Sequence, residues 1–236
     1  MLRDLKDDGV IFAKGEKVRK TTYKEQAYKL IREAILYQRL KAGKIYSQEA
    51  LCEELGASRT PIREALLELQ KEGYLVFCRG KGIKIVSLDQ EAIREILEAR
   101  LYLERITAKL AAERADKEDM RYIEACLLSE HEDLIIHREK NDIAKSYQLD
   151  HQFHRAVAKA SHNRQIYNML DNILNMYLRF ETQTVYHNAS SANSILEEHD
   201  AIFHSVANHE AEKAEEAAEH HLLRAYRRTL KEYWKE

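Results

Sequence analysis

Histidine is concentrated in the second part of the chain, where the spacing of three short patterns could bring ligand atoms together. All 11 histidines follow residue 130. Asp150 and His154 are spaced i, i+4, which places a carboxylate and an imidazole on one face of a helix, about 5–6 Å apart. His199 lies on an apolar helical stripe, and His221 lies on a stripe of alanines. One aspartate and three histidines from three helices could therefore meet at one point.

This set of side chains favours a divalent metal. Neutral imidazoles and a carboxylate suit Zn²⁺, Ni²⁺, Mn²⁺ or Fe²⁺ and leave a position for water or a ligand atom. Spacing alone also allows histidines that are simply buried in a core or an interface. His220 would replace His221 if the helical register differs, whereas His151 lies one residue away from the face of Asp150.

Arg100 occupies an unexpected position for a charged side chain. It lies on an apolar helical stripe with Ile93, Ile96 and Leu97, where an unpaired guanidinium would be costly. One explanation is an ion pair with Glu104, which follows one helical turn later.

A second group of side chains has the chemistry of DNA recognition. Arg59 and Arg63 would project together from the first turn of a helix whose opposite face is apolar. In helix-turn-helix proteins the N-terminal end of such a helix enters the major groove, where arginine pairs with guanine. The hydroxyls of Ser58 and Thr60 suit phosphates. The plainer alternative is a solvated, charged helix face.

The elements that would position these arginines form a recognisable pattern. Helices are expected at 23–39, 48–55 and from residue 59 to Gly73, with Ser58 as the cap of the third helix. The expected buried stripes are Ala27, Leu30, Ile31, Ala34 and Ile35 in the first helix, and Ile62, Ala65, Leu66 and Leu69 in the third. Two strand-like runs, 74–78 and 83–86, flank a basic tip that contains Gly80 and Lys81. Three helices and this hairpin predict a winged helix-turn-helix.

The second part of the chain contains neither of the strongest helix breakers. All 7 glycines lie at or before Gly82, and the single proline is Pro61. Helices are expected at 90–114, 118–138, 142–160, 163–184, 191–208 and 210–234. Their short connections favour an antiparallel bundle. The predicted fold is mainly α, with an arm at 1–20, a winged helix-turn-helix domain at 21–88 and an all-helical domain at 89–236.

Charge is divided unevenly between the two parts. Residues 17–88 contain 15 Lys and Arg against 8 Asp and Glu, whereas residues 89–236 contain 20 against 28, within a net charge of −2. The basic part suggests a polyanion as its partner, and a chance imbalance of surface charge is the alternative. The 3 cysteines are isolated, and no signal peptide or membrane-spanning run is evident. We therefore expect reduced thiols in a cytoplasmic protein that has no membrane partner.

The segment from Leu51 to Leu66, followed by Glu72-Gly73-Tyr74-Leu75, resembles the DNA-binding domain of GntR-family regulators. The family motif reads Leu-Ala-x-x-Leu-Gly-Val-Ser-Arg-Thr-Pro-Val-Arg-Glu-Ala-Leu and ends in Glu-Gly-Leu. The resemblance implies that the DNA contacts are Arg59, Thr60, Arg63, Gly80 and Lys81. Glu49 departs from the pattern, because many relatives carry a DNA-contacting arginine there. Either that contact is missing or the operator differs.

The sequence of the second part resembles the FCD ligand-binding domain of the FadR-like branch of that family. Leu149-Asp150-His151-Gln152-Phe153-His154, followed by Ala158–Asn163, is similar to the FCD signature Asp-x-x-Phe-His…Asn. Glu198-His199 and His221-Leu222 match its later motifs. The resemblance implies a metal bound by Asp150, His154, His199 and His221. It also implies that Arg100 binds an effector carboxylate beside this metal.

These features together predict a DNA-binding transcription regulator rather than an enzyme. We expect a homodimer on a palindromic double-stranded operator, controlled by a small organic acid, with repression as the favoured mode. A DNA-binding dimer without metal or effector is one alternative. A helical-bundle metalloenzyme is the other, and it is disfavoured because no histidine has glutamate three residues before it, as di-iron bundles require. The zinc-hydrolase motif His-Glu-x-x-His is also missing.

Overall fold

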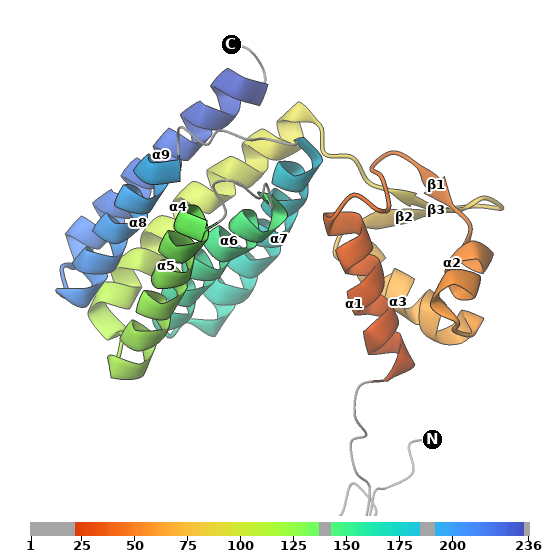
Figure 1. Ribbon diagram of the computed structural model, residues 1–236, viewed down its shortest axis with the longest axis horizontal. Coiled ribbons are helices and arrows are strands. Elements are labelled where there is room, and N and C mark those ends of the chain that lie inside the picture. Colours follow the sequence, from red (N-terminus) through yellow and green to blue (C-terminus); the bar gives the residue numbers. More distant parts are fainter. Residues whose placement is uncertain (1–21, 137–142, 185–191, 234–236) are drawn as a thin grey trace, which may run out of the picture.

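The computed structural model describes residues 22–136, 143–184 and 192–233. In these ranges nine helices and three short strands gather into two bodies (Figure 1). The predicted fold, a winged helix-turn-helix followed by an all-helical bundle, is confirmed. The arm expected at 1–20 lies outside the described residues. Among the residues described, no helix combines the length and apolar character that crossing a bilayer requires.

The first body contains α1 (Tyr23–Leu36), α2 (Gln48–Leu55) and α3 (Arg59–Lys71) and a small antiparallel sheet. The sheet consists of β1 (Ile45–Tyr46), β2 (Leu75–Cys78) and β3 (Gly82–Ile85), in the order β1-β3-β2. The sequence did not predict β1, because two residues are too short to show alternation. Gly82 is required where β3 passes β1: its φ is +104°, and a Cβ there would lie 2.1 Å from the carbonyl oxygen of Tyr46.

The core of the first body follows the predicted helical stripes with one exception. All four predicted α3 positions are fully buried: Ile62, Ala65, Leu66 and Leu69. Ala27, Ile31 and Ile35 of α1 are buried as well and Ala34 is partly buried against them, but Leu30 is 45% exposed. The prediction for Leu30 was wrong because the buried stripe of α1 follows the i, i+4 row through Ile31, which leaves Leu30 at its margin.

The first helix ends earlier than its expected limit at residue 39. It ends at Leu36, because Gln38 adopts a left-handed backbone conformation with φ of +57°. The amide of Leu40 then donates a hydrogen bond to the carbonyl of Ala34 at 2.8 Å, and the Leu40 side chain is buried in the core.

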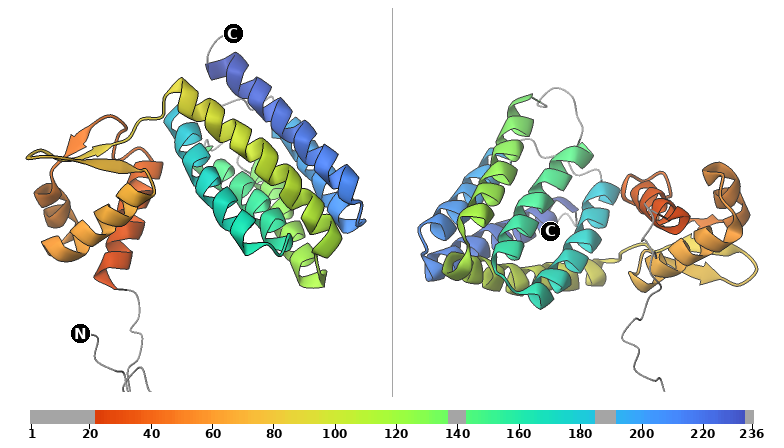
Figure 2. Two further views of the ribbon diagram at one scale, coloured as in Figure 1. Left: turned by 180° about the vertical axis from the view of Figure 1, so that it is seen from behind. Right: turned by 90° about the horizontal axis from the view of Figure 1, so that it is seen from below.

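The second body is a bundle of six described helices that lie side by side (Figures 1 and 2). They are α4 (Gln90–Arg114), α5 (Lys117–Ile136), α6 (Ile143–Ala160), α7 (Arg164–Thr184), α8 (Ala192–Ala207) and α9 (Ala211–Tyr233). All six were predicted, although the ends expected at 138, 142, 191 and 234 lie outside the described residues. Helix α4 packs against α6, α7 and α9 and therefore forms the centre of the bundle.

Helix α7 connects the bundle to the first body. The buried guanidinium of Arg179 donates to the carbonyl of Gly73 at 3.1 Å and to that of Val86 at 2.8 Å, and it lies 4.7 Å from the ring of Tyr74. Leu178 of the same helix belongs to the apolar core of the first body. Figure 1 shows α7 on the side of the bundle that faces α1.

Candidate functional site

The predicted DNA contacts of α3 lie on one exposed surface. Ser58, Arg59, Thr60 and Arg63 are all exposed at the N-terminal end of the helix, opposite its buried stripe. Ser58 occupies the cap position, but its hydroxyl makes no capping hydrogen bond, so the expected side-chain cap is not formed. The hydroxyl of Ser58 therefore does not occupy the first backbone amides of α3, for which it would otherwise compete with a DNA phosphate.

The predicted contacts of the wing lie at the tip of the hairpin between β2 and β3. Gly80 and Lys81 are both exposed there. The backbone of Gly80 is left-handed, with φ of +71°, and no other part of the described chain lies within 4 Å of an added Cβ. The tip therefore presents backbone and the two cations Arg79 and Lys81, a combination that suits a phosphate backbone.

Glu49, the residue that departs from the family motif, lies beside a predicted DNA contact. Its Oε1 is 3.4 Å from Nη2 of Arg59, and both side chains are largely exposed. The Ser47 hydroxyl donates to Oε2 of Glu49 at 2.8 Å and holds the pKa of this carboxyl below its ordinary value. A negative charge is therefore fixed on the surface that would approach DNA phosphates.

Replacing Glu49 with glutamine is expected to strengthen operator binding by about 3- to 10-fold, because it removes one repulsive charge and releases Arg59. The affinity should also depend more steeply on salt. Fluorescence anisotropy with a labelled operator at several salt concentrations measures both effects. Glu53→Gln, an exposed change on the same helix, is the control, and equal effects of the two variants would contradict this role of Glu49.

The structure brings the four predicted metal-binding residues together inside the bundle. His154 of α6, His199 of α8 and His221 of α9 are buried, and one ring nitrogen of each lies within 4.8 Å of the others. The carboxylate of Asp150 lies 3.7 Å from Nε2 of His154 and 3.7 Å from Nε2 of His199. His220 is exposed and points elsewhere, so the helical register places His221 in the cluster.

Each of the three imidazoles is oriented by a buried glutamate. The Nδ1–carboxylate distances are 2.5 Å for His154 with Glu104, 2.8 Å for His199 with Glu130 and 2.8 Å for His221 with Glu198. Such a carboxylate partner fixes the tautomer of a histidine and directs its other nitrogen. Sequence reasoning missed this role of all three glutamates. The position of Glu198 directly before His199 was the only local signal.

Two of the ring nitrogens opposite these glutamates lack partners. Nε2 of His154 and Nε2 of His199 are both buried and have no hydrogen-bond partner among the described residues. Burial lowers the pKa of His221 to about 3, so its ring is neutral. Burial would raise the pKa of Asp150, but His154 and His199 hold it below its ordinary value. Burial would lower the pKa of His199, but Glu130 and Asp150 raise it above its ordinary value. The neutral ring of His221 and the ionised carboxylate of Asp150 are donors that suit a divalent cation.

Arg100 is part of the same network. It is 2% exposed, its Nε donates to Oε1 of Glu104 at 2.6 Å, and its guanidinium lies 4.4 Å from the ring of Tyr177. The predicted ion pair with Glu104 is therefore present. Because the other oxygen of Glu104 contacts His154, one carboxylate joins the guanidinium to the histidine cluster.

His151 points away from the three clustered histidines. It is fully buried, with Nε2 2.7 Å from Oε2 of Glu181 and its ring stacked 6.0 Å from that of Tyr177. Burial lowers the pKa of His151 to about 3 and raises that of Glu181. His151 therefore joins the surroundings of Arg100 and Tyr177 rather than the cluster.

The winged helix-turn-helix and the helical bundle define a class of protein: a DNA-binding regulator with a C-terminal helical domain. Residues 23–85 match the family model "Bacterial regulatory proteins, gntR family", and residues 95–224 match the model "FCD domain". The chain belongs to the GntR family of transcription regulators, in the branch that carries an FCD domain. It is a regulator of transcription and not an enzyme.

Individual relatives agree with this assignment. The chain is 32% identical over 203 residues to the HTH-type transcriptional regulator YdhC of Bacillus subtilis. This match covers 86% of the chain and 87% of that protein. It is 26% identical over 205 residues to the Glc operon transcriptional activator of Escherichia coli K12, covering 78% and 79%. The E. coli McbR/YncC structure has the same fold, with a TM-score of 0.75 at 19% identity, over 91% of this chain and all of that one.

Proposed function

We propose that this regulator binds a palindromic operator as a homodimer and responds to a small organic acid beside a divalent metal. The operator-binding domain would be residues 21–88 and the sensor domain residues 89–236. One observation carries the proposal: buried glutamates bind Nδ1 of three histidines, which leaves Nε2 of His154 and His199 buried, unpaired and close to Asp150. An unpaired buried nitrogen is unfavourable unless a ligand binds it.

The metal would be held by Asp150, His154, His199 and His221. Zn²⁺, Ni²⁺, Mn²⁺ and Fe²⁺ all accept three imidazoles and one carboxylate. When bound, the metal would supply a positive charge and an open position that attract an acidic ligand. The three glutamates would keep the imidazoles oriented, and their burial excludes water from the Nδ1 side.

Measuring the metal content of variants at two adjacent histidines tests this assignment. Purified protein should contain about one divalent ion per chain, and His221→Ala should lose most of it, whereas His220→Ala should keep it because His220 is exposed. Inductively coupled plasma mass spectrometry measures the ion. Metal-free wild-type protein with normal operator binding would instead support the alternative of a DNA-binding dimer without a metal.

The effector is proposed to be a small acid whose carboxylate contacts Arg100. The planar guanidinium has five N–H donors, and Glu104 uses the one on Nε. A carboxylate bound there would lie close to the histidine cluster, because Glu104 contacts both Arg100 and His154.

A thermal-shift screen of small organic acids, with and without divalent metals, should identify the effector class. A ligand present at 100 times its Kd stabilises the folded state by about 2.7 kcal/mol through mass action. The active acid should raise Tm only when metal is present, and Arg100→Gln should abolish that increase. Arg227→Gln, an exposed change on α9, is the matched control. An increase that persists in Arg100→Gln would exclude this role.

The proposal of a dimer on a palindromic operator is supported by the small size of the surface that α3 offers to DNA. One short helix contacts few bases, so useful specificity requires two half-sites about one helical turn apart. We propose repression as the mode of control, and the E. coli relative that is named an activator makes a direct test necessary. A reporter placed behind the operator should be more active in cells that lack the regulator, and the opposite result would assign activation.

A further inference from the structure

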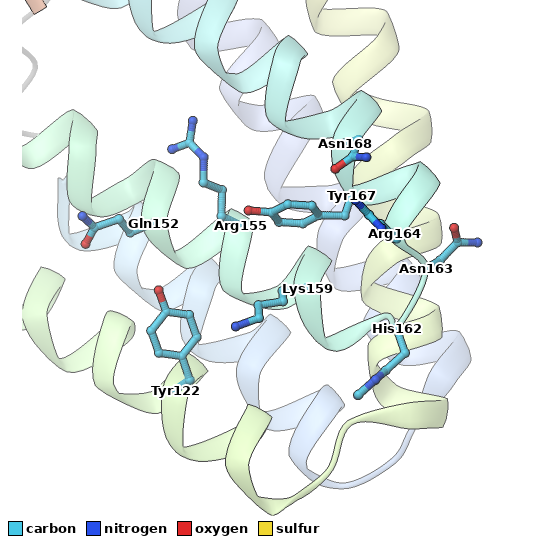
Figure 3. Close-up of a pocket in the computed structure, with 9 residues that line it drawn as sticks. All are labelled: Tyr122, Gln152, Arg155, Lys159, His162, Asn163, Arg164, Tyr167 and Asn168. Atoms are coloured by element: carbon cyan, nitrogen blue, oxygen red, sulfur yellow. The ribbon is translucent and has the colours of Figure 1, made fainter. Parts of the chain in front are cut away.

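A pocket of about 500 Å³ lies on the outer side of the bundle, where α5, α6 and the first turns of α7 meet (Figure 3). The side chains that carry the argument are Tyr122, Arg155, Lys159, His162, Arg164 and Tyr167. None of the four proposed metal ligands lines this pocket. Its volume is in the range of pockets that bind small molecules.

The lining of this pocket is basic, although the residues that follow Leu88 are acidic overall. Its lining residues include two arginines, one lysine and one histidine, and none is acidic. Arg155 is held from behind, since its Nε lies 2.5 Å from Asp171 and its Nη2 lies 2.9 Å from Asn175. His162 is likewise held by Asp119 at 2.6 Å.

Two cations of the pocket remain uncompensated. Throughout the described ranges, no carboxylate forms an ion pair with Lys159 or Arg164, and both side chains are exposed. Lys159 instead lies 5.4 Å from the ring of Tyr122. Positive charges that no acidic residue neutralises are available to an anionic ligand.

Two tyrosines complete the lining. Tyr122 is 51% exposed, and Figure 3 shows Lys159 between the rings of Tyr122 and Tyr167. Aromatic faces bind flat rings by offset stacking, and tyrosine hydroxyls add hydrogen bonds. The pocket therefore presents a charged part and an aromatic part to the same ligand.

We propose that this pocket is a second ligand site, separate from the metal-centred one, and that it binds a small organic anion carrying a flat ring. Lys159 and Arg164 bind the anionic group, and Tyr122 and Tyr167 bind the ring. Arginine favours phosphate or carboxylate because its planar donors match both groups. The site would not suit a metal cation, because its lining residues repel positive charge.

Isothermal titration calorimetry of the full-length protein tests the site with three probes: phenyl phosphate, benzoate and inorganic phosphate. Phenyl phosphate or benzoate should bind more tightly than inorganic phosphate, and comparing the two identifies the preferred anionic group. Lys159→Gln and Arg164→Gln should each weaken binding by about 10-fold. Lys213→Gln, which changes an exposed lysine on α9, should bind as the wild type does.

A second pair of variants separates this pocket from the metal-centred site. Tyr167→Leu should weaken phenyl phosphate binding more than inorganic phosphate binding, and Arg100→Gln should leave both unchanged. The proposal would be overturned if neither aromatic probe binds at a concentration of about 10 mM, or if the probes bind Lys159→Gln and the wild type with equal affinity. It would also be overturned if Lys159→Gln and Arg164→Gln changed dimerisation in sedimentation without changing probe binding, because that would assign this face to a second copy.

Discussion

Replacing Arg63 with alanine is expected to weaken specific operator binding by about 10- to 100-fold, the effect of losing 1–3 kcal/mol from one bidentate contact to guanine. Arg63 is exposed on α3, one turn after Arg59 and opposite the buried stripe. Arg59 is partly occupied by Glu49, whereas no carboxylate in the described part of the chain pairs with Arg63. We therefore expect Arg63 to contribute more than Arg59 to base recognition.

Anisotropy titrations with the operator and with a scrambled duplex separate specific from electrostatic binding. Arg63→Ala should reduce the difference between the two duplexes, while metal content and acid binding stay unchanged. Lys71→Ala is the matched control, because Lys71 is an exposed cation at the opposite end of the same helix. Unchanged operator affinity in Arg63→Ala would mean that another surface reads the bases.

Local spacing was sufficient to predict the helices, the hairpin of the wing and the buried face of α3, but not the two-residue strand β1. The α3 stripe from Ile62 to Leu69 repeats with helical periodicity and is fully buried, so the face that carries Arg63 follows from it. The histidine cluster was predictable for the same reason, since His154, His199 and His221 each lie on the inner face of a helix. The family resemblance then indicated which inner faces meet.

The partners of these residues were not predictable, because they depend on how helices pack. Glu130 contacts His199 from α5, 69 residues earlier in the chain, and nothing in its neighbouring sequence marks it. Arg179 is similar: its sequence context is an ordinary amphipathic helix, yet its guanidinium is buried against the first body. Side-chain pairs between distant helices require the tertiary arrangement.

Helix α7 is the element through which ligand binding would reach the DNA-binding domain. At one position its Tyr177 packs against Arg100, and two residues later Arg179 binds the carbonyls of Gly73 and Val86. Gly73 lies two residues after the end of α3, and Val86 directly follows β3, a strand of the wing. A shift of α7 at the proposed effector site would therefore change the placement of both DNA-reading elements.

Replacing Arg179 with methionine is expected to remove most of the coupling between acid binding and operator binding. The change leaves two carbonyls without their donors, at a cost of about 1–3 kcal/mol for each that stays buried, and so loosens the contact of α7 with the first body. Coupling between two sites is commonly about 1–3 kcal/mol, so operator affinities with and without the acid should differ by about 5- to 150-fold in the wild type and by little in the variant.

The measurement compares operator affinity with and without the acid selected by thermal shift, and hydrogen exchange of the amides from Gly73 to Val86. In Arg179→Met these amides should exchange faster, whereas metal content and acid affinity of the bundle should be retained, since the contacts that the substitution removes are with Gly73, Val86 and Tyr74 of the first body. Arg227→Met is the control for losing an exposed arginine.

If Tm falls but the acid still changes operator affinity as in the wild type, Arg179 only stabilises the contact, and the coupling passes through another part of the chain. If faster exchange and loss of coupling occur together, the contact between α7 and the first body carries the effect of the acid to the DNA-binding domain.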